Sequence, residues 1–98
     1  MTDRLTFRAE IPDDLASAAN WYDRQHLGLG DEFLSDYRRT LDMLISSPLL
    51  RAADSTGMRF WRLKRFPYRI LYRVGDNSIL VAAVFHTRRD PNTLLERR

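Results

Sequence analysis

Hydrophobic and polar residues alternate most regularly between residues 65 and 74 of the chain. The even-numbered positions from Phe66 to Val74 are all apolar or aromatic, whereas Arg65, Arg69 and Arg73 stand at odd-numbered positions. A period of two predicts a half-exposed strand, because successive side chains of a strand point to opposite faces. We therefore expect one face of this strand to join the core and the other to carry a row of guanidinium groups.

The sequence on either side of this strand predicts two more strands. The first runs from Met58 to Lys64, and Pro67 interrupts it, since proline within such a run marks a turn or an edge. On the other side, residues 75–78 predict a hairpin loop, because glycine, aspartate and asparagine tolerate positive φ. The apolar run from Ile79 to Phe85 then predicts a strand buried on both faces, at the centre of a sheet.

The first half of the chain predicts one strand and two helices. Alternation from Arg4 to Ala9 favours a short strand. Apolar residues at helical spacing follow Pro12 and predict a helix to about Leu27, with Gly28 as its left-handed C-cap. A second helix should start at Asp31 and end before Pro48. The short connection requires the two helices to fold back as a hairpin.

This order of elements predicts one α+β domain over residues 1–98. The helix hairpin should pack on one face of a four-stranded, mainly antiparallel sheet and leave the other face partly open. After the last strand, Pro91 is expected to open a short terminal helix that frays.

Charge is distributed unevenly along the chain. Residues 1–50 carry 5 arginines against 9 acidic residues, a net charge of −4, whereas residues 51–98 carry 10 arginines and 1 lysine against 4 acidic residues, a net charge of +7. Lys64 is the only lysine, and arginine offers a planar fork suited to phosphate and carboxylate groups. This pattern favours an anionic partner, either nucleic acid or an acidic protein segment, although such arginines also simply keep a sheet face hydrated.

Composition also argues against several classes of protein. The chain has no cysteine and only two isolated histidines, so we expect no metal site and no cofactor. No apolar run approaches the roughly 20 residues of a membrane span, and the first residues lack the apolar core of a signal peptide. We therefore expect a cytoplasmic protein without membrane contact.

Basic residues near the strands are the main candidates for a binding site. Side chains two residues apart in a strand share a face of the sheet, and this period suggests that the basic residues converge into a concavity. An error of one residue in the register of any strand would place its basic residues on the opposite face. The candidates for contact with a target or partner are Arg62, Lys64, Arg65, Arg69, Arg73, Arg88 and Arg89. Stacking of nucleobases on an exposed aromatic residue, Trp61 for instance, is a weaker alternative.

His86 is the one histidine placed where catalysis would use it, at the end of the central strand. Such a group takes a proton from a ribose 2′-hydroxyl while arginines such as Arg69 and Arg88 stabilise the developing charge. In the other interpretation, His86 packs against the sheet and hydrogen-bonds a loop. The residues alone leave both roles open.

The order and spacing of several motifs resemble the toxins of the RelE/ParE superfamily, which belong to type II toxin–antitoxin systems. The resemblance covers nearly the whole chain. It is carried by Asp14-Leu15, Ala18, Trp21-Tyr22, Gly28-Leu29-Gly30, Phe33-Leu34, Pro48, Gly57-Met58-Arg59, the segment from Arg65 to Tyr72, and the segment from His86 to Pro91.

The resemblance implies a β-α-α-β-β-β fold and neutralisation by a ParD-like or related antitoxin. RelE-like members cleave mRNA on the ribosome with a basic cluster and often a tyrosine or histidine near the C-terminus, whereas ParE-like members, often called plasmid stabilisation proteins, poison DNA gyrase. This chain has a single lysine and no tyrosine after Tyr72. The resemblance therefore favours the ParE-like activity, and the alternative is a RelE-like nuclease that uses His86, Arg69 and Arg88.

Overall fold

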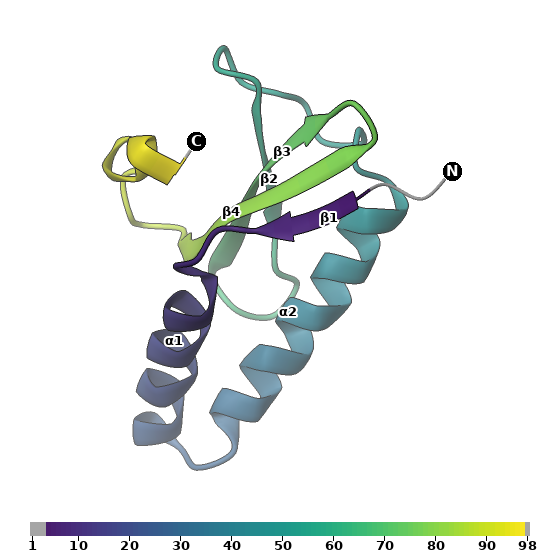
Figure 1. Cartoon of the computed structure of the whole chain (residues 1–98). Helices are drawn as coiled ribbons and strands as arrows, with labels where there is room; N and C mark the ends of the chain where they lie inside the picture. The colour runs from purple at the N-terminus through teal and green to yellow at the C-terminus, as the bar shows by residue number, and fades with distance from the viewer. Residues whose placement is uncertain (1–3, 98) are drawn as a thin grey trace.

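A computed structural model describes residues 4–97, which form a helix hairpin and a four-stranded sheet (Figure 1). The elements follow one another in the predicted order β-α-α-β-β-β, and a 3₁₀ turn closes the chain. They are β1 (Arg4–Phe7), α1 (Ile11–Gln25), α2 (Leu29–Ser46), β2 (Met58–Arg62), β3 (Tyr68–Gly75), β4 (Ser78–His86) and the 3₁₀ turn η1 (Pro91–Arg97). Neither helix of this described part is long and apolar enough to cross a membrane.

The sheet has the strand order β1-β4-β3-β2, so the apolar strand β4 lies inside it as predicted. β1 pairs with β4 in parallel, and the other two pairings are antiparallel, which confirms the mainly antiparallel sheet. The pairing of β3 with β4 shifts between Leu71 and Tyr72, which leaves Ala82 without a directly opposed residue. This bulge turns both Ala82 and Ala83 to the same face of the sheet, where they pack together.

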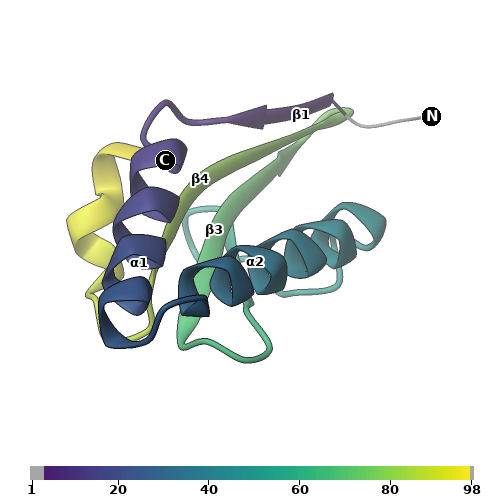
Figure 2. The same ribbon diagram turned by 90° about the horizontal axis from the view of Figure 1, so that it is seen from below.

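The sheet separates two clusters of buried side chains. Both helices cover one face, as Figures 1 and 2 show, and the larger cluster lies between them and residues such as Ile70 and Tyr72. A smaller cluster on the opposite face contains Leu71 and Phe85 and is covered by η1. Leu94 of η1 is only 1% exposed, so the prediction of a frayed terminal helix is wrong.

The helix hairpin differs from its prediction at the turn. α1 ends at Gln25, and Gly28, with φ of 96°, precedes α2 as its N-cap instead of closing α1. The Asp23 carboxylate fixes this turn by accepting hydrogen bonds from the N–H groups of Gly28 (3.2 Å) and Gly30 (2.8 Å). A Cβ on Gly30 would stand 2.6 Å from the Ala19 carbonyl oxygen, so glycine is required where the helices meet.

Candidate functional site

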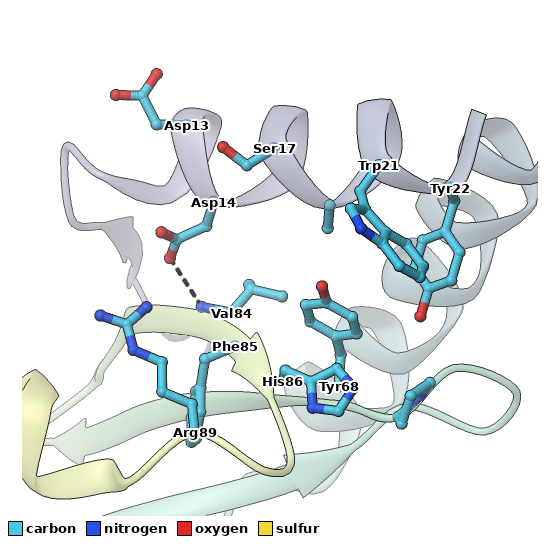
Figure 3. Close-up of a pocket in the computed structure, with 12 residues that line it drawn as sticks. Asp13, Asp14, Ser17, Trp21, Tyr22, Tyr68, Val84, Phe85, His86 and Arg89 are labelled. Atoms are coloured by element: carbon cyan, nitrogen blue, oxygen red, sulfur yellow. Dashed lines mark hydrogen bonds between the residues drawn. The ribbon is translucent and has the colours of Figure 1, made fainter. Parts of the chain in front are cut away.

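A groove of about 800 Å³ lies between α1 and the end of the sheet (Figure 3). The helix contributes both acidic and aromatic side chains, and the strand ends contribute aromatic and basic ones. The lining residues are Asp13, Asp14, Ser17, Ala18, Trp21, Tyr22, Pro67, Tyr68, Val84, Phe85, His86 and Arg89. We call this feature the α1 groove.

The α1 groove exists because β1 is shorter than β4. β1 was predicted to reach Ala9 but ends at Phe7, opposite Val81, so the outer edge of β4 runs on with no strand beside it among the described residues. Asp14 takes the place of the missing strand there, because its carboxylate accepts the Val84 N–H at 3.0 Å. Arg97 of η1 donates to the same carboxylate oxygen and neutralises its charge. The N–H and C=O of one strand residue point to the same side, so the Val84 carbonyl also faces this edge.

Aromatic rings form the wall of the α1 groove. Trp21 is 50% exposed and meets Tyr22 edge to face, with ring centroids 5.1 Å apart. Burial raises the pKa of the Tyr68 phenol, and burial followed by the neighbouring Tyr68 raises the pKa of Tyr22. Both phenols therefore keep their protons near neutral pH and offer hydrogen bonds rather than acting as bases.

His86 sits in this groove and not among the arginines of β3. Its ring lies edge to face against Tyr68, with centroids 5.3 Å apart. The backbone N–H of Arg88 donates to His86 Nδ1 at 3.1 Å, so the remaining proton of the neutral ring is on Nε2. The lone pair that a general base needs is thus already used to hold the turn after β4.

Three candidate arginines of β2 and β3 lie on the other side of the sheet. Arg62 and Arg69 are directly opposed in the β2–β3 register, and Arg73 follows four residues later on β3. All three therefore share the face opposite the helices, which confirms the predicted alternation of β3. We call these three residues the arginine face.

The remaining basic candidates lie at the same end of the sheet as Arg62 and Arg69. Lys64 and Arg65 are exposed in the loop between β2 and β3, and Arg65 pairs with Glu32 of α2 at 3.0 Å. Arg88 and Arg89 are exposed just past β4, and Arg89 borders the α1 groove.

Two features of the predicted site need correction. The structure does not bring His86 to Arg69, because the directly paired residues Tyr68 and His86 share the helix side, whereas Arg69 shares the opposite side with Phe85. Trp61 is buried in the helix-side core, so it offers no ring for stacking. The exposed tryptophan is Trp21.

Sequence reasoning missed the two carboxylates that organise the site. Asp14 was named only within the motif Asp14-Leu15, and Asp36 was not singled out. Asp36 is buried on α2 and accepts backbone N–H groups from the loop that holds Lys64 and Arg65. The signal for Asp36 was its place in the apolar stripe of α2, beside Tyr37, where an unpaired carboxylate would be costly. Within residues 4–97, no cluster of histidine and acidic side chains suited to a metal ion occurs.

Comparisons with known proteins agree with this architecture. The family model described as the ParE toxin of the type II toxin–antitoxin system parDE matches residues 5–91. Among solved structures, a chain described as the chromosomal ParDE TA system from P. aeruginosa is similar, with a TM-score of 0.76 and 17% identity. That match covers 87% of this chain and 96% of the other. The search of curated proteins gave no match.

Proposed function

Since the chain belongs to the ParE toxin family of type II toxin–antitoxin systems, we propose that it arrests growth by poisoning DNA gyrase and that a cognate antitoxin neutralises it. The observation that carries the choice of target is the separation of His86 from the arginine face by the sheet. Without a base beside the arginine face, that surface is better suited to binding a target than to cleaving RNA. The action would take place in the cytoplasm, where gyrase works.

The alternative function, ribosome-dependent mRNA cleavage, requires a proton acceptor and a cationic group around one phosphate. Arg69 is on the wrong face to share a phosphate with His86, and His86 Nδ1 is occupied by the Arg88 N–H. Of the two arginines considered for catalysis with His86, only Arg88 lies close to it in the chain. This arrangement favours gyrase over mRNA as the target.

Replacing His86 with alanine is expected to leave toxicity within about threefold of the wild-type level, because the ring packs and holds a turn rather than moving a proton. The measurement is the induction level that halves the growth rate, with protein abundance determined in the same cells. His86→Gln, which retains a hydrogen-bond acceptor, serves as the control for turn stability. Loss of toxicity in both variants at normal abundance would support the nuclease instead.

We assign two complementary surfaces to the antitoxin. The α1 groove suits an extended segment, because it combines aromatic rings with the edge of β4 at Val84, where no strand pairs with β4 among the described residues and only the Asp14 side chain bonds the backbone. The basic residues suit carboxylates of the same partner and also form the proposed contact surface for the target. They are Arg62, Lys64, Arg65, Arg69, Arg73, Arg88 and Arg89.

Induction of the toxin alone in growing cells tests the choice of target. Plasmid DNA from these cells should lose negative supercoiling, or accumulate breaks, before mRNA patterns change. Codon-phased cuts in mRNA within minutes of induction, with supercoiling intact, would contradict the proposal. Coexpression of the antitoxin should abolish the topological change, which identifies it as a consequence of the free toxin.

A further inference from the structure

Arg62 and Arg69 face each other directly across β2 and β3 on the open side of the sheet. Like charges in such opposed positions destabilise a sheet. Within the described part of the chain, no carboxylate lies within 4.0 Å of Arg62, Arg69 or Arg73. The fold thus holds an uncompensated pair of positive charges, which an external anion would stabilise.

The hydrogen-bonding capacity of this pair is also unused. The Arg69 guanidinium lies over the rings of Phe60 and Phe85, at 4.8 and 5.1 Å from their centroids. Its Nε is buried without an acceptor, and among residues 4–97 neither Arg62 nor Arg69 donates a side-chain hydrogen bond. Stacking on two rings therefore orients a planar fork whose terminal donors have no acceptor among the described side chains and backbone, and such forks bind phosphate groups well.

Arg73 extends this surface along β3. Four residues of strand separate it from Arg69, a distance of about 13 Å. Its guanidinium donates to the Thr56 carbonyl at 3.2 Å, which restrains the side chain. One phosphate is too small to reach both ends of such a row, so the spacing fits an anion with repeated charges.

We propose that the arginine face binds the phosphodiester backbone of duplex DNA. A duplex presents one negative charge per about 1.7 Å of its axis, so guanidiniums spaced along a strand meet phosphates in many registers, whereas a peptide must place its carboxylates individually. The net charge of +7 on residues 51–98, against −4 on residues 1–50, would orient the molecule with this half toward a polyanion. The role of this contact in the cell rests on the proposed function: a toxin bound to gyrase would lie next to the DNA duplex that gyrase holds.

Fluorescence anisotropy with a labelled duplex of about 20 base pairs tests this contact without gyrase. Three phosphate contacts predict a slope of log K against log salt of about −2.7, which is a roughly 40-fold loss of affinity between about 50 and 200 mM salt. The double variant Arg62→Ala, Arg69→Ala should bind more weakly, with a slope of about −0.9. Arg69→Lys, which keeps the charge and loses the planar fork, should keep a slope near −2.7.

The matched control is the double variant Arg38→Ala, Arg39→Ala, which removes the same charge from the exposed side of α2. It should retain the wild-type slope. The proposal is overturned if the wild type does not bind the duplex at low salt, or if both double variants reduce the salt slope by the same amount. It is also overturned if polyglutamate, tested in place of the duplex, binds to the arginine face and the duplex does not. Because no gyrase is present, these outcomes are independent of whether the protein poisons gyrase.

Discussion

Replacing Asp36 with alanine is expected to lower the free energy of unfolding by about 3–5 kcal/mol. Asp36 is 1% exposed, and its carboxylate accepts the N–H groups of Lys64 (3.3 Å), Arg65 (2.8 Å) and Phe66 (3.1 Å). Removal of the acceptor leaves backbone donors unpaired in a buried turn, and each such donor costs about 1–3 kcal/mol. Because a domain of this size has a stability of only about 5–15 kcal/mol, the loss is a large part of the total.

Urea unfolding followed by circular dichroism measures this loss. Asp42→Ala is the matched control, because Asp42 is exposed on the same helix, and it should change the unfolding free energy by less than about 0.5 kcal/mol. Asp36→Asn, which keeps one acceptor oxygen, should fall between the two. Equal stability of the Asp36→Ala and Asp42→Ala proteins would show that the carboxylate does not hold the loop.

Replacing Trp21 with alanine is expected to weaken antitoxin binding by about 30-fold or more, which corresponds to about 2 kcal/mol. The ring is the most exposed part of the aromatic wall of the α1 groove, and large aromatic side chains dominate interface energies. Titration calorimetry with the purified cognate antitoxin measures the change. In cells, the same variant should need more antitoxin for rescue while remaining toxic.

Leu27→Ala supplies the comparison for Trp21. Leu27 is 86% exposed between the helices and lies outside the groove, so its truncation removes apolar surface without touching the proposed contact. Its antitoxin affinity should remain within about twofold of the wild type. If Trp21→Ala bound the antitoxin as tightly as Leu27→Ala, the α1 groove would not be the docking surface.

The parts of the fold that depend on local pattern could be predicted from the sequence. The alternation from Phe66 to Val74 defined both faces of β3, because a strand imposes its period on every residue within it. The apolar run of β4 likewise indicated its place inside the sheet. Gly28 was recognised as a left-handed residue but assigned to the wrong helix, because a glycine in a three-residue connection serves either end equally well.

The candidate site was less predictable, because it depends on where strands end and which neighbours they meet. The two-residue period assigns side chains to faces within one strand, but it does not show which residues of β3 share a face with residues at the end of β4. His86 at that end lies on the helix side, against Tyr68. The α1 groove depends on β1 ending two residues earlier than its alternation suggested. Asp36 meets its partners 28 to 30 residues further along the chain, a distance at which no local period indicates a contact.

The most direct test of the central claim is a titration of purified gyrase with the purified toxin. Relaxed plasmid, ATP and gyrase are mixed with increasing toxin, and the products are separated after treatment with detergent and protease. The account predicts that supercoiling falls, that linear DNA accumulates from trapped cleavage complexes, and that prior addition of antitoxin prevents both. Undiminished supercoiling without linear DNA, at a large molar excess of a toxin preparation that still arrests growth in cells, would contradict it.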